Sequence, residues 1–236
     1  MVPQGRRSPT RRAGDRGVGC GERHRGSQGT TGDGASSTTN ETGAPALATT
    51  DVSGTWSVDT EAGDFDDETA TGSFAGFRIE EELARVGSAT AVGRTGDVTG
   101  TVEIDGSSVT AATFEVDLTT ITTNEERRDD NVQDALETSR YPTATFTLTE
   151  PIDLGDAAQT GAAVTTTATG DLTIHGVTRS VQFPLEAQLV GETIVVVGSL
   201  DLTFGDFDVQ VPDSMIVVSV EDHGILELQL LLVRAP

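Results

Sequence analysis

The sequence predicts an all-β domain, an antiparallel closed barrel with one short helix in a strand connection. Apolar and polar residues alternate with a two-residue period in many segments, which is typical of half-buried strands. Turn signals separate these segments at short intervals, and Val, Thr and Gly are plentiful while aromatic residues make up 4%. About eight to ten strands follow from this pattern. A closed barrel is favoured over an open sandwich because long strands would otherwise leave unpaired edges.

The domain is predicted to span residues 51–236, after a segment of different composition at residues 1–50. Seven of the 15 Arg lie in the first 25 residues, and the next 25 are mostly Gly, Ser, Thr and Ala. This composition predicts a disordered Arg-rich segment and a flexible linker, because it cannot bury enough apolar surface to offset its ordering entropy.

The first strands are predicted on either side of an acidic loop. Trp56 and Val58 alternate with polar neighbours and indicate a strand, and residues 60–73 are acidic and small. Residues 74–86 fit a strand, although the run of Glu80 to Glu82 leaves a short helix open. Residues 92–104 fit a single extended segment whose glycines mark bulges or bends, and Asp105-Gly106 predicts a tight turn.

The middle of the chain predicts a strand, a short helix and a second strand. Residues 112–118 and 144–148 alternate with period two, whereas Val132, Ala135 and Leu136 recur at helical spacing. Asp129 and Asp130 precede these apolar residues, where carboxylates stabilise a helix N-terminus. Tyr141-Pro142 prevents the helix from continuing, because proline disfavours the α region for the residue before it.

The last part of the chain predicts long strands. Residues 164–174 are Thr-rich and favour a β-strand, which ends at His175-Gly176. The next strand is predicted at residues 177–189. It contains Pro184, which cannot donate a ladder hydrogen bond, so this strand lies near an edge or a bulge. Gly191-Glu192 is the next turn. Residues 194–204 alternate for eleven residues, and two final strands are predicted at residues 215–220 and 225–233, around a turn at Asp222-His223-Gly224.

Charge excludes several partners. From Asp51 onward, 8 Arg face 34 Asp and Glu, a formal charge of −26. Such a domain repels phosphate backbones and anionic membrane surfaces, so we expect no nucleic acid partner and membrane contact only through a tether. The sequence contains no run of eighteen apolar residues that would predict a transmembrane helix.

The N-terminal segment leaves two interpretations open. A basic start, Gly-Val-Gly-Cys and a long Ser/Thr/Gly tether resemble a bacterial lipoprotein, with Cys20 as the lipid attachment point, although no intact signal peptide is visible. Alternatively, Cys20 is an inert thiol in a disordered tail. The single cysteine excludes an intrachain disulfide.

Two segments resemble the YceI-like family of bacterial proteins. Thr122 to Phe146 contains Thr-(x)5-Arg-Asp, a short helix and Tyr-Pro-Thr-Ala-Thr-Phe, and Gly170 to Phe183 reads Gly-Asp-Leu-Thr-Ile-His-Gly-Val-Thr-Arg-Ser-Val-Gln-Phe. The resemblance implies a lipocalin-like antiparallel barrel of eight strands that holds a polyisoprenoid or quinone-like lipid. It also implies an extracytoplasmic location, in the periplasm, secreted or at the cell surface, and no established catalytic reaction.

The candidate ligand-binding residues are the inward rows of the predicted strands and one arginine. They are Phe77, Phe114, Phe146, Phe183, Leu202, Phe204 and Arg128. The apolar residues either line a hollow lumen or fill it as a packed core, and periodicity cannot separate these alternatives. Arg128 either meets a polar head group or pins the helix to the barrel, with Asp129 capping the helix.

No catalytic or metal-binding motif is found, so we predict a protein that is not an enzyme and has no cofactor other than a bound lipid. The sequence lacks Gly-x-Ser-x-Gly, His-x-His and His-x3-His, although His175 and His223 with an acidic residue remain geometrically open as metal ligands. The predicted function is an exported lipid carrier, and the alternative is a ligand-free structural or stress-response domain. A homodimer is left open beside a monomer.

Overall fold

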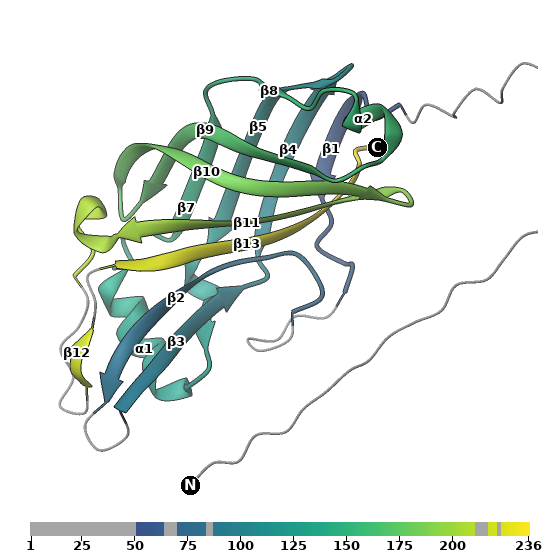
Figure 1. Ribbon diagram of the computed structural model, residues 1–236. Helices are drawn as coiled ribbons and strands as arrows, with labels where there is room; N and C mark the ends of the chain where they lie inside the picture. Colours follow the sequence, from purple (N-terminus) through teal and green to yellow (C-terminus); the bar gives the residue numbers. More distant parts are fainter. Residues whose placement is uncertain (1–50, 64–69, 84–86, 211–216, 221–222) are drawn as a thin grey trace, which may run out of the picture. The chain divides into compact units, whose positions relative to one another are not determined.

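The computed structural model describes residues 51–63, 70–83, 87–210, 217–220 and 223–236 (Figure 1). The predicted disordered segment at residues 1–50, with Cys20, lies outside the described residues. The described residues belong to one compact unit, residues 45–236.

Eight antiparallel strands close into a barrel, as the sequence analysis predicted. In order around the ring they are β1 (Gly54–Val58), β4 (Val98–Asp105), β5 (Ser108–Asp117), β7 (Thr143–Leu148), β9 (Val164–Ile174), β10 (Val177–Val190), β11 (Thr193–Thr203) and β13 (His223–Arg234). The ring closes where β13 pairs with β1, with Trp56 opposite Arg234. Full closure removes the sheet edges that long strands would otherwise expose.

Strand β13 also carries a second, shorter sheet. Its first half pairs with β2 (Phe74–Leu83), which pairs in turn with β3 (Gly87–Thr95) and β12 (Val217–Val220). Its last residues pair with β1, so one long strand serves the barrel and the β2–β3 hairpin that extends from it (Figure 1). Two-residue strands complete the set, β6 (Thr122–Thr123) beside β3 and β8 (Ile152–Asp153) beside β5.

The structure corrects three local predictions. Residues 92–104 form two strands rather than one, because the chain turns back at Gly96-Asp97 between β3 and β4. Residues 80–82 belong to β2, so the helical alternative there is wrong. His223 begins β13 opposite Thr203 and does not lie in a turn.

The predicted helix is present. Helix α1 spans Glu126–Ala135, and Asp129 lies in its first turn, where the sequence predicted a carboxylate. The Asp129 carboxylate accepts hydrogen bonds from the backbone N–H and the hydroxyl of Thr123, at 2.9 and 2.7 Å. Because Thr123 is part of β6, this contact fixes the start of α1 to the sheet. A second short helix, α2 (Ala157–Thr160), lies between β8 and β9, where the sequence analysis predicted no helix.

The structure agrees with the predicted turn at His175-Gly176 and with the predicted position of Pro184 near the end of a strand pairing. His175 and Gly176 have φ of 52° and 74°, the left-handed values that a two-residue hairpin turn requires between β9 and β10. Pro184 pairs with Thr167 of β9, and the pairing of β10 with β11 begins only at the next residue, Leu185. Proline therefore stands where its missing N–H costs no ladder hydrogen bond to β11.

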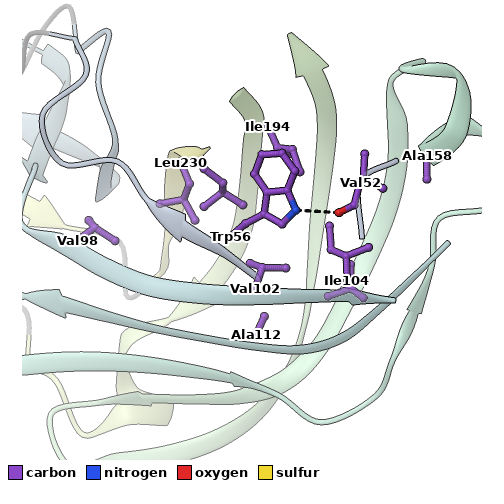
Figure 2. Close-up of a cluster of buried hydrophobic side chains, with 11 residues drawn as sticks. Val52, Trp56, Val98, Val102, Ile104, Ala112, Ala158, Ile194 and Leu230 are labelled. Carbon is purple, nitrogen blue, oxygen red and sulfur yellow. Dashed lines mark hydrogen bonds between the residues drawn. The ribbon is translucent and has the colours of Figure 1, made fainter. Parts of the chain in front are cut away.

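The core divides into two clusters along the barrel. One surrounds Trp56, whose indole N–H donates to the carbonyl of Val52 at 2.8 Å (Figure 2). Val102, Ile104, Ile194 and Leu230 belong to the same cluster. The other cluster lies at the α1 end and includes Leu172, Leu202, Phe204 and Phe207.

Candidate functional site

An apolar cavity of about 250 Å³ runs inside the barrel. A single water needs roughly 10–15 Å³ of such space, so this volume is far beyond the small voids of a packed core. Most strands of the barrel contribute residues to its wall, and so do the segments that contain α1 and α2. The wall includes Val102, Val116, Leu136, Ala144, Leu148, Ala158, Thr166, Leu185, Ala187, Val196, Leu228 and Leu232. The barrel is therefore hollow, which the sequence left open.

Four of the predicted residues line this cavity. They are Phe77, Phe114, Phe146 and Phe183, one each from β2, β5, β7 and β10. Phe114 and Phe146 lie opposite each other across β5 and β7. The alternation of each strand turns these side chains inward, as the sequence predicted.

The other three predicted residues lie elsewhere. Leu202 and Phe204 are buried in the cluster at the α1 end and are not part of the cavity wall. Arg128 lies in α1, and its guanidinium donates to the side-chain carbonyl of Asn124 at 2.8 Å. Arg128 is not a wall residue either.

The α1 end of the barrel is plugged by apolar side chains. Phe207 is 1% exposed, and it lies in the 3-10 helix η2 (Phe204–Phe207), which follows β11. Val132 of α1 and Leu136, which directly follows the helix, pack against the same cluster. These contacts cover the apolar side of a helix that is too short to be stable alone.

His175 joins three elements at this end. Its Nδ1 lies 3.3 Å from the carbonyl oxygen of Phe207, its Nε2 lies 3.6 Å from a carboxylate oxygen of Glu137, and its ring meets Tyr141 edge to face at 4.7 Å. Glu137 follows α1, and Phe207 belongs to η2, so the imidazole ties both to the β9–β10 turn. These contacts give His175 a structural role.

The opposite end is covered by α2. Ala157, Ala158, Gly161 and Ala162 border the cavity there. The sequence analysis missed this segment, although Ala favours helices and Gly161, with φ of 70°, ends α2 in the left-handed conformation typical of helix C-termini. The Ala-rich run before Gly161 is the sequence signal that could have identified α2.

A partly buried ion-pair network lies beside the wall. Glu227 of β13 borders the cavity, and its carboxylate binds Arg94 of β3 and Arg78 of β2, each at 2.6 Å. The Arg94 side chain is only 8% exposed, and its guanidinium also lies 4.6 Å from the centre of the Phe74 ring. This network fastens the β2–β3 hairpin to the barrel and neutralises the carboxylate at the wall.

We expect Glu227→Gln to destabilise the protein by about 1.5–3 kcal/mol, because it removes the carboxylate that binds the buried Arg94 guanidinium at 2.6 Å. Urea unfolding followed by circular dichroism measures this change. The matched control is Glu80→Gln on the same hairpin, which changes an exposed carboxylate that accepts a hydrogen bond from the Thr90 hydroxyl at 2.9 Å and is expected to cost less than about 1 kcal/mol. Equal losses for the two variants would contradict the burial argument.

The described residues offer little for catalysis. Among them no group of three or more His, Cys, Asp and Glu side chains is placed to hold a metal ion. The cavity wall, as far as it is described, contains no His, Cys, Ser or Tyr that could act as nucleophile or base. No described helix is both long and apolar enough to cross a membrane.

Among the known proteins that are similar to this chain are two curated relatives and one solved structure. A UPF0312 protein of Vibrio parahaemolyticus is 33% identical over 118 residues, 46% of this chain and 58% of that protein. Protein YceI of Escherichia coli O157:H7 is 35% identical over 124 residues, 51% of this chain and 58% of that protein. The chain thus spans somewhat over half the length of these curated relatives.

The third similarity is structural. A domain from Saccharophagus degradans, described as a polyisoprenoid binding domain implicated in plant cell wall breakdown, aligns with a TM-score of 0.58. The alignment covers 76% of this chain and 98% of that domain at 20% identity, so it supports the fold alone. The family model described as the YceI-like domain matches residues 49–232. This range includes the whole barrel apart from the last residues of β13. The chain therefore belongs to the YceI-like family.

Proposed function

We propose that this protein binds one apolar, isoprenoid-like lipid chain in the barrel and shields it from water. The observation that carries the proposal is the cavity of about 250 Å³, whose wall is almost entirely aliphatic and aromatic. Each buried methylene contributes about 0.8 kcal/mol, so an apolar wall alone can hold a long chain tightly. The polyisoprenoid binding domain of Saccharophagus degradans has the same fold and supports this choice of ligand class.

The cavity favours a binding protein over a ligand-free domain with a filled core. Protein interiors are normally packed as densely as organic crystals, and a dry void of this size forfeits dispersion contacts along its whole wall. A bound chain restores those contacts.

The test is mass spectrometry of an organic extract of the full chain, purified without detergent from a bacterial host, with native mass spectrometry alongside. We expect one lipid per barrel and a hydrocarbon tail in the extract. An empty protein that also fails to take up added isoprenoids would contradict the proposal. Native mass spectra also distinguish a monomer from a homodimer.

We further propose an extracytoplasmic location with Cys20 as a lipid attachment point. The basic start, the Gly-Val-Gly-Cys sequence and the long polar tether support this proposal. Cell fractionation of the native host should place the protein outside the cytoplasmic fraction, and Cys20→Ser should release it from membranes. Recovery of the protein in the cytoplasmic fraction would contradict export.

A further inference from the structure

We propose that four glycines determine how wide a lipid chain the barrel accepts: Gly93, Gly100, Gly170 and Gly198. Each one leaves space for the ring of a phenylalanine on a neighbouring strand, so that the ring lies close against the backbone of that strand. The inference rests on the proposed function and assigns the width selectivity of that same site to particular residues.

Two of these glycines lie directly opposite a phenylalanine. Gly93 of β3 pairs with Phe77 of β2, and Gly100 of β4 pairs with Phe114 of β5. Because opposite residues of an antiparallel pair share one face of the sheet, a side chain at either glycine would point to where the ring lies. A Cβ atom at Gly93 would lie 2.5 Å from Cζ of Phe77, and one at Gly100 would overlap Cδ1 of Phe114.

The other two glycines lie diagonally from a phenylalanine. Gly170 of β9 stands beside Phe146 of β7, and Gly198 of β11 stands beside Phe183 of β10, each two residues away from direct opposition. Aromatic side chains reach such diagonal neighbours. A Cβ atom at Gly170 would overlap Cζ of Phe146, and one at Gly198 would lie 2.9 Å from Cε1 of Phe183.

The four rings stand between these glycines and the cavity. All four phenylalanines belong to the cavity wall, whereas the glycines that they cover do not. Carbon atoms in contact prefer a separation of about 3.5–4.0 Å, so a Cβ atom at Gly93 would displace the Phe77 ring by about 1 Å. The three atoms nearest to that position all belong to this ring, and the ring borders the cavity, so the cavity is where it can move.

A displaced ring narrows the cavity at one level of the barrel. Affinity falls about fourfold for each methylene that no longer finds room. A methyl-branched chain is wider than a straight chain, so it loses contacts first when the cavity narrows. Glycine beneath each ring therefore keeps the cavity wide enough for a branched chain.

The experiment measures two alcohols with main chains of equal length, the branched geranylgeraniol and the straight hexadecanol, on the full chain after delipidation. For Gly93→Ala we expect geranylgeraniol to bind about fourfold to fifteenfold more weakly than to the wild type, the loss of room for one or two methylenes. Hexadecanol binding should change less than about twofold. Competition against a fluorescent fatty acid measures both affinities.

A second substitution tests whether the ring causes the loss. Phe77→Leu keeps an apolar side chain but has no ring to displace, so adding Gly93→Ala to Phe77→Leu should change geranylgeraniol binding less than about twofold. If Gly93→Ala does not fold, the same pair of measurements is made at β11 with Gly198→Ala and Phe183→Leu.

The matched control is Gly224→Ala, at a glycine–phenylalanine pair outside the cavity wall. A Cβ atom there would lie 2.6 Å from Cζ of Phe204, which belongs to the cluster at the α1 end. We expect a lower melting temperature and an unchanged ratio of the two alcohol affinities. This control separates a general loss of stability from a change in cavity width.

Three results would overturn the inference while leaving the proposed function intact. They are equal losses for the two alcohols in Gly93→Ala, a loss that persists in the Phe77→Leu background, and a shift of the affinity ratio in Gly224→Ala as large as in Gly93→Ala. Failure of the wild-type chain to bind either alcohol would contradict the proposed function itself, and the inference would fail with it.

Discussion

The variant Ala187→Trp is expected to empty the barrel of lipid while leaving it folded. Ala187 lies on the inward row of β10, opposite Val164 of β9 and Val196 of β11, and all three line the cavity. An indole at this position occupies space that a lipid tail would otherwise fill. Losing room for even three methylenes costs about 2.4 kcal/mol at about 0.8 kcal/mol each, which is roughly a 50-fold loss of affinity.

The fold should survive because the new ring enters an empty space instead of an occupied core, so overpacking strain is small. We expect an unchanged circular dichroism spectrum, an unchanged or higher melting temperature without lipid, and little lipid in the organic extract. The control is Thr165→Trp, which places the same ring on the exposed face of the neighbouring strand. Normal lipid content in purified Ala187→Trp would contradict the proposal that the lumen is the binding site.

The variant Trp56→Ala is expected to destabilise the full chain by about 3–5 kcal/mol, the usual cost of removing a large buried aromatic side chain. Trp56 is 2% exposed and stands among Val102, Ile104 and Leu230 (Figure 2). Its strand, β1, is the element that closes the barrel between β4 and β13. Urea unfolding with fitted midpoints and slopes measures the change.

The control Trp56→Phe separates packing from hydrogen bonding. It keeps an aromatic ring in the cluster but removes the indole N–H that bonds the Val52 carbonyl, so we expect a smaller loss of about 1–2 kcal/mol. A loss below about 1 kcal/mol for Trp56→Ala would show that closure of the barrel through β1 contributes little to stability.

The local elements were predictable because their signals are local. Alternation identified β5, β7, β10 and β11, and His175-Gly176 and Asp105-Gly106 identified two hairpin turns. Asp129 was predicted to lie at the start of the helix, and it lies in the first turn of α1. The hydrogen bonds that its carboxylate accepts from Thr123 were not predictable, because a sequence pattern does not show the turn that brings the two residues together.

The division of the inward rows was not predictable. Phe146, Phe183, Leu202 and Phe204 all occupy apolar positions of alternating strands, and periodicity treats them alike. The structure separates them, since the first two line the cavity and the last two plug the α1 end. Whether an apolar side chain lines the cavity or plugs its end depends on where η2 and α1 pack. Their position depends on contacts between residues that are distant in sequence.

By itself the sequence determined the strand periodicity, the turns, the acidic character of the domain and the family resemblance. Only the tertiary structure decided that the barrel is hollow, that β13 pairs with both β1 and β2, and that Arg94 is buried against Glu227. The physical reason is that alternation fixes which face of a strand is apolar, but a filled and an empty barrel need the same apolar face. The space between those faces is set by the number, tilt and register of the strands that close the ring.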